Sequence, residues 1–318
     1  MDEKSPLSEI IRHDPVGRCV YCGTTSPPLR EEHIIPEGMG GTLILPEASC
    51  DGPASCAEKT SLFERTLQRQ MYPAARAYWQ LYGKRRKWTR PTSFQVRYGT
   101  ETSPNVDVSI DNYPLSIFMP ILQPPGMIAG RPLEPDLPKL TADDFWSYTF
   151  EEGKKRASDL LAASGASKIA IVQEFVFTDF LKFLAKVAHC YAVSYFGPSL
   201  IDASMLRKLI LAPKGALTHG ALQLIGCAYD GPGGQLVTST PNNGEAYTLG
   251  LRFVDFDNLT RRALVAEIHL FAHTNAPVYQ VVVAGGGLIA SLAPELQSGP
   301  PVPFPTPTTR LTKPHGPS

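Results

Sequence analysis

Residues 19–56 read CVYCGTTSPPLREEHIIPEGMGGTLILPEASCDGPASC, and they decide the fold because four of the chain's six cysteines fall within them. The first two form a C-x-x-C knuckle followed by glycine, and five residues separate the last two. Four thiolates at this spacing suit a closed tetrahedral zinc site. A module this small buries too little apolar surface to fold alone, and zinc binding supplies the missing free energy. The spacing therefore predicts a structural Zn2+ ion, as opposed to four unrelated free thiols, with the ligands Cys19, Cys22, Cys50 and Cys56.

A second motif lies between the two cysteine pairs, where Glu32 and His33 are followed by Ile-Ile-Pro and then by the glycine pair Gly40–Gly41. Together with the cysteines, this motif resembles the HNH endonuclease family, in its four-cysteine, zinc-stapled branch. The resemblance covers about residues 17–65. It implies a ββα-metal module, in which a β-hairpin leads into an α-helix and the zinc joins hairpin to helix.

The same resemblance implies roles for two residues of the motif. His33 takes the position of the general base that activates water, which suits a side chain whose ordinary pKa lies near neutrality. Glu32 takes the position of a ligand to a catalytic Mg2+ or Mn2+ ion, which would contact the scissile phosphate. The implied activity is metal-dependent hydrolysis of DNA, with RNA as the alternative substrate. The alternative for His33 is a histidine that closes a strand and bonds a backbone carbonyl.

Two positions depart from the family's pattern. Thr42 stands nearest to an asparagine that orients the histidine in many members, and Ala57 follows Cys56 where many members carry a second metal ligand. Glu58 and Glu64 are the nearby acids that can replace that ligand, and we expect Glu64 to do so. These departures raise a second hypothesis, a catalytically inactive zinc module that binds nucleic acid or protein.

A run of basic side chains follows the zinc module. Residues 65–90 hold eight lysines and arginines and no acid, although the whole chain has a formal net charge of zero. Basic residues around a tryptophan suit contact with a phosphate backbone and stacking on a base, and the alternative is a solvated basic loop. The first two arginines are one helical turn apart and are expected to face one groove. The predicted nucleic-acid-binding residues are Arg65, Arg69, Lys84, Arg85, Arg86, Lys87, Trp88 and Arg90.

The rest of the chain predicts an α+β fold, because helical and strand patterns occur without regular alternation. Residues 178–197 have the clearest helical periodicity, and apolar or alternating runs predict strands at 221–229, 247–254, 264–273 and 278–285. Residues 142–164 are mostly helical in composition. We expect an N-terminal arm at 1–16, followed by the zinc module with its basic extension at 17–90. A strand pair with a Pro-rich linker at 91–138 then leads to an α+β domain at 139–295 and a disordered Pro-rich tail at 296–318.

Composition restricts the class of protein and its partners. The chain lacks an apolar run long enough for a membrane span, and its start lacks a secretory signal pattern, so we expect a cytoplasmic protein without a membrane partner. Cys190, Cys227 and His189 lie in apolar stretches and are expected in the core. His269 and His273 are expected on a strand, without a metal. The C-terminal domain is expected to serve homo-oligomerisation, or binding of a regulatory partner or effector.

Overall fold

The computed structural model describes residues 10–26, 28–78, 94–133, 136–213, 220–230, 234–238, 245–256, 261–285 and 309–310. Helices and strands mix along these ranges, which confirms the α+β class. The basic segment at 84–90, which includes Trp88, lies outside the described residues.

The N-terminal region contains a hairpin followed by a helix, in the order that the motif implied. Strand β2 (Leu29–His33) pairs antiparallel with β3 (Leu43–Cys50), and helix α1 (Cys56–Thr66) follows. Strand β1 (Ile11–Arg12) adds to the free edge of β3 in parallel, so these two residues of the predicted arm belong to the sheet. The hairpin and α1 bring both ends of residues 19–56 together.

Two glycines, Gly40 and Gly41, allow the backbone path of the connection between β2 and β3. A short 3-10 turn, η1 (Glu37–Met39), ends at Gly40, whose φ of 87° lies in the left-handed region that favours glycine. A Cβ atom on Gly41 would lie 1.7 Å from the carbonyl oxygen of Ile35. The hairpin therefore needs the glycine pair for its backbone path.

Helix α1 continues into a π-helical turn, after which the helix is interrupted at Pro73. The turn η2 (Leu67–Met71) ends where the Tyr72 amide donates to the Leu67 carbonyl at 2.8 Å, and α2 (Pro73–Tyr78) begins at the proline. Proline has no N–H to donate, so it begins a helix readily and interrupts one from within. The predicted interruption at Pro73 is confirmed.

Two small sheets and several helices make up the middle of the chain. β4 lies between β5 and β8, and β6 pairs with β7, all antiparallel. The mostly helical prediction for residues 142–164 is wrong over residues 145–149, because these form β7 and pair with β6. The bounds are β4 Phe94–Tyr98, β5 Asn105–Val108, β6 Ser116–Pro120, α3 Gly126–Ala129, η3 Ala142–Asp144, β7 Phe145–Thr149, α4 Glu151–Ser164 and β8 Ile169–Val172.

A five-stranded antiparallel sheet follows, in the order β13-β10-β11-β12-β9. The predicted strands of this region are present, although the first of them begins as the short helix α8. Thr309 and Arg310 pair with β10, which corrects the prediction of disorder for these two residues, and the rest of the tail lies outside the described chain. The bounds are α8 Ala221–Leu224, β9 Ile225–Cys227, β10 Glu245–Phe256, β11 Arg261–Leu270, β12 Val278–Gly285 and β13 Thr309–Arg310.

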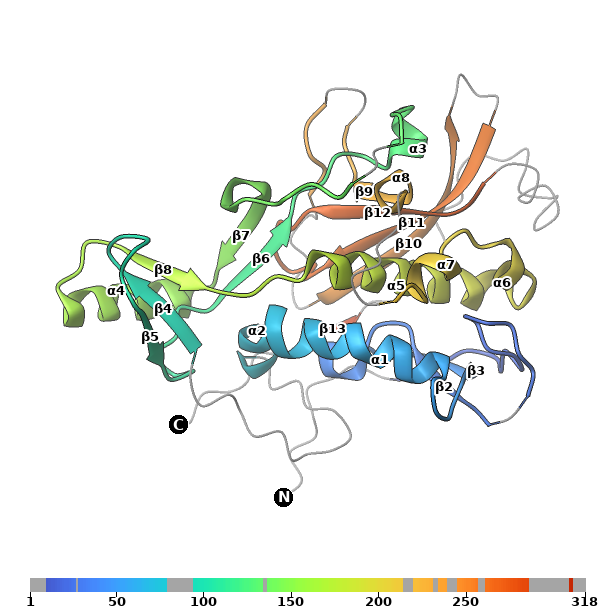
Figure 1. The fold of residues 1–318 in the computed structure, drawn as a ribbon, viewed down its shortest axis with the longest axis horizontal. Helices are drawn as coiled ribbons and strands as arrows, with labels where there is room; N and C mark the ends of the chain where they lie inside the picture. Colours follow the sequence, from blue (N-terminus) through green and yellow to red (C-terminus); the bar gives the residue numbers. More distant parts are fainter. Residues whose placement is uncertain are drawn as a thin grey trace.

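The helix α5 (Phe177–Phe196) lies between this sheet and α1 (Figure 1). It contacts β11 and β12 on one side and α1 on the other, and its buried residues extend around the whole helix. One hydrophobic core joins the cysteine-containing N-terminal region to the sheet, from Cys19 to Ala284. The short helices α6 (Ser199–Ala203) and α7 (Arg207–Ile210) follow α5. Every helix in the described ranges is too short or too polar to cross a bilayer.

Candidate functional site

The four cysteines of residues 19–56 converge on one point. Their sulfur atoms all lie within 4.8 Å of one another, and the Sγ atoms of Cys22 and Cys50 are 3.8 Å apart. A tetrahedral ion with bonds near ~2.3 Å separates its sulfur ligands by about 3.8 Å. All six cysteines of the chain are free thiols, so the cluster is not a pair of disulfides. The cluster has the donor set and spacing of a metal site.

Backbone geometry holds the thiols in place. In the knuckle, the amide of Gly23 donates to the carbonyl of Cys19 at 2.8 Å, and Gly23 has a φ of 82°. At the start of α1, the Cys56 amide donates to the sulfur of Cys50 at 3.4 Å. A hydrogen bond from the Cys56 thiol lowers the pKa of Cys19 to about 4. A thiolate is the form that ligates metal, so the cluster is suited to capture a cation.

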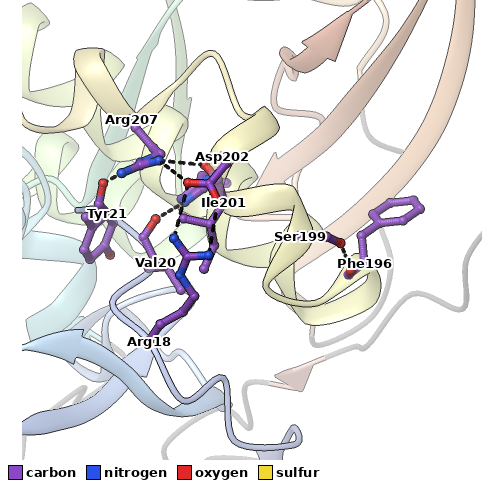
Figure 2. Close-up of polar contacts among 9 residues, drawn as sticks. Arg18, Val20, Tyr21, Phe196, Ser199, Ile201, Asp202 and Arg207 are labelled. Carbon is purple, nitrogen blue, oxygen red and sulfur yellow. Dashed lines mark hydrogen bonds and ion pairs between the residues drawn. The ribbon is translucent and has the colours of Figure 1, made fainter. Parts of the chain in front are cut away.

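The knuckle is fastened to the C-terminal half by side chains that the sequence did not reveal. Figure 2 shows Arg207 beside the knuckle, where its Nε donates to the carbonyl of Tyr21 at 2.6 Å. Arg207 also pairs with Asp202 at 3.1 Å, and Arg18 approaches both oxygens of that carboxylate at 3.1 and 3.3 Å. Such outer contacts fix the orientation of metal ligands. The position of the cysteine cluster thus depends on α6 and α7 as well as on its own module.

His189 makes a second connection from the core to the knuckle. Its Nε2 lies 2.7 Å from the carbonyl oxygen of Val20, and the residue is fully buried in α5. A carbonyl only accepts, so Nε2 carries a proton in this contact. Burial lowers the pKa of His189 to about 4, assisted by the positive charge of Arg207 and opposed by the bond to Val20. The predicted location of His189 in the core is confirmed.

This buried ring predicts a loss of stability on acidification. A pKa of about 4 in the folded protein and about 6.5 in the unfolded chain means that protonation favours unfolding. The contribution is complete above the unfolded pKa and is lost as the pH falls towards 4. Between about pH 7 and pH 5 the free energy of unfolding should fall by about 2 kcal/mol more in the wild type than in His189→Gln. Urea unfolding at each pH measures this difference, and equal slopes for both proteins would contradict the assignment.

The two acids expected to bind a catalytic ion do meet, but a lysine lies between them. Lys186 of α5 places its Nζ atom 2.9 Å from an oxygen of Glu32 and 2.9 Å from an oxygen of Glu64. Burial alone would lower the pKa of Lys186, but the two carboxylates raise it above its ordinary value, so it carries a charge. Burial raises the pKa of Glu64, with the Lys186 charge opposing. An ammonium group holds the position expected for Mg2+ or Mn2+, so these residues as arranged do not fit that ion.

His33 is engaged on a different face of the strand from Glu32. Its Nε2 lies 4.0 Å from Glu31, two positions back, and Glu31 also pairs with Arg12 at 2.9 Å. Successive side chains of a strand alternate between faces, so Glu31 and His33 share one face while Glu32 points into the core. The side chain of His33 is 18% exposed. Thr42, the candidate to orient it, shares a hydrogen bond of 3.2 Å with the hydroxyl of Tyr247 in β10.

A pocket of about 480 Å³ lies beside α1 and η2, facing α5 and α7. Arg65 and Arg69, which are one helical turn apart, both line it, and so does Lys59. Arg76, from the same basic run, instead turns inward, where its Nε donates to the carbonyl of Gly38 at 2.6 Å. Within the described residues, α1 and η2 therefore place three basic side chains along one side of this pocket.

Comparisons with known proteins give no relative. No protein-family model matches the chain, and neither a curated protein nor a solved structure matches it.

Proposed function

We propose that this chain is a zinc-stapled nucleic-acid-binding protein of HNH-like ββα architecture. The zinc ion is structural and is held by the four clustered thiolates. The observation that carries the proposal is the charge of the pocket beside α1 in a chain of zero net charge. Four basic residues line it against one acid, Asp179, and the four are Lys59, Arg65, Arg69 and Lys182. Cations along a helix and its continuation suit contacts with successive phosphates, which give affinity without reading sequence.

Binding is favoured over cleavage because of Lys186. Hydrolysis of the HNH type needs a divalent ion at the position that the Lys186 ammonium holds between Glu32 and Glu64. A metal-dependent nuclease is the second candidate. It is favoured by the convergence of these same two carboxylates, of which Glu32 takes the position that the resemblance implied and Glu64 is the expected substitute for the second ligand.

The binding proposal predicts a defined effect of the two arginines. Replacing Arg65 and Arg69 by alanine should weaken binding of labelled DNA about tenfold. It should also reduce the magnitude of the slope of the logarithm of the binding constant against the logarithm of the salt concentration by about two. Fluorescence anisotropy with duplex DNA, single-stranded DNA and RNA measures both quantities. The matched control removes two exposed lysines of α4, Lys154→Ala with Lys155→Ala, and should bind as the wild type does.

The same samples separate the two candidates. Plasmid DNA incubated with Mg2+ or Mn2+ should remain intact with the wild type. Cleavage that His33→Ala abolishes would replace the binding proposal with the nuclease. Absence of binding to all three nucleic acids, at low salt and with zinc loaded, would contradict a role on nucleic acid.

A further inference from the structure

Three buried charged residues meet beneath the hairpin, each from a different element. Glu32 comes from β2, Glu64 from α1 and Lys186 from α5. The lysine side chain is fully buried, and those of the two acids are 9% and 18% exposed. Buried charges persist in proteins when they are paired, because an isolated one carries a large desolvation cost. The three residues therefore form one electrostatic unit.

The surroundings of the ammonium group resemble those of a metal ion. Besides the two carboxylate oxygens, Nζ of Lys186 donates to the backbone carbonyl of His33 and lies 3.2 Å from that of Ile34. Two carboxylate and two carbonyl oxygens converging on one point are the hard ligands that Mg2+ and Mn2+ select. An ammonium group has three protons for these four acceptors, so the set exceeds what a lysine alone requires.

We propose that the ammonium of Lys186 is a tethered replacement for a divalent cation in this oxygen cage. Because the ammonium group is covalently part of the chain, it occupies the cage at every concentration of free metal. A divalent ion can enter only where Nζ now lies, and like charges at that distance repel strongly in a buried site. The wild-type protein therefore binds no Mn2+ through Glu32 and Glu64, and shortening Lys186 opens a Mn2+ site there.

The second consequence concerns charge. When both carboxylates are ionised, the single ammonium leaves one negative charge uncompensated within the triad. Removal of the ammonium leaves both carboxylates facing each other in the core, which favours capture of a cation with two charges. Glu64 should be essential to that capture, since without it the cage retains one carboxylate.

Mn2+ titration followed by electron paramagnetic resonance tests the proposal on the zinc-loaded protein without nucleic acid. Lys186→Ala should bind one Mn2+ per chain at least about tenfold more tightly than the wild type. Lys186→Ala combined with Glu64→Gln should lose the gain. The matched control is Lys182→Ala, one turn earlier in α5, because Lys182 is also buried but bonds the carbonyls of Ala212 and Pro213. It should gain no Mn2+ site.

Each result decides the matter. Folded Lys186→Ala that binds Mn2+ no better than the wild type overturns the proposal. So does Mn2+ binding by the wild type that Glu64→Gln removes, because the ammonium is then displaced by the ion. This second comparison remains valid even if Lys186→Ala fails to fold, and equal titrations of the wild type and Glu64→Gln support the replacement. The readout is independent of nucleic acid, so it stands whether or not the anisotropy experiment finds binding.

Discussion

Loss of the zinc ion is expected to unfold the N-terminal module and to lower Tm by at least about 10 °C, or roughly 4 kcal/mol. The proposed ion would join the knuckle, the end of β3 and the start of α1, so its removal would disconnect the hairpin from the helix. Cys19 and Cys56 are buried, and without an ion their sulfurs lose their principal partner. Cys19→Ser should show the same loss, because serine is a poor zinc ligand.

Elemental analysis and calorimetry measure this prediction together. The wild type should contain one zinc per chain, and Cys19→Ser should contain none. The matched control is Cys227→Ala, since Cys227 is buried in β9 far from the cluster in sequence and its sulfur accepts from the amide of Leu122. That variant should keep its zinc even if it loses some stability. A wild-type protein without stoichiometric zinc would remove the basis of the metal centre.

Gly41→Ala is expected to destabilise the protein by more than about 3 kcal/mol. The added methyl would lie 1.7 Å from the carbonyl oxygen of Ile35, a contact that only a backbone shift can relieve. That shift would displace the turn between β2 and β3 and with it Glu32 and His33. The substitution therefore acts on the hairpin without touching a charged group or a metal ligand.

Urea unfolding checks the size of this effect. Gly250→Ala in β10 is the matched control, because its added methyl meets no atom closer than 3.8 Å and its backbone needs no left-handed conformation. It should change the free energy of unfolding by less than about 1 kcal/mol. A Gly41→Ala protein as stable as the wild type would mean that the turn has another path available.

Local patterns were enough to predict much of the fold. The cysteine spacing predicted the thiol cluster, the periodicity of residues 178–197 predicted α5, and Pro73 predicted the break after α1. Each of these signals acts over a few residues, through backbone geometry or through the burial of one helix face. One exception is β7, which was missed although its aromatic residues and threonine favour a strand, because the residues around it are helical in composition.

The candidate site was predicted incompletely, for a physical reason. The resemblance implied Glu32, the departure at Ala57 led to Glu64 as a substitute, and the structure brings the two acids together. Lys186 and Arg207 were missed because they are distant in sequence and lie within runs that otherwise look like ordinary helix. A charged residue in an apolar helix is the one available signal, and Lys186 is one of two lysines fully or nearly buried in α5. Which acidic residues pair with Lys186 is determined by tertiary packing.

The single core also bears on how such a chain can change over generations. The inner face of α1 is covered by α5, which begins more than a hundred residues later. A recombination event anywhere between them would separate surfaces that complete each other, leaving Phe63 and Leu67 bare to water. The cysteine-containing segment therefore cannot be transferred to another protein without α5. A substitution on the inner face of α1 also requires a compatible residue on α5.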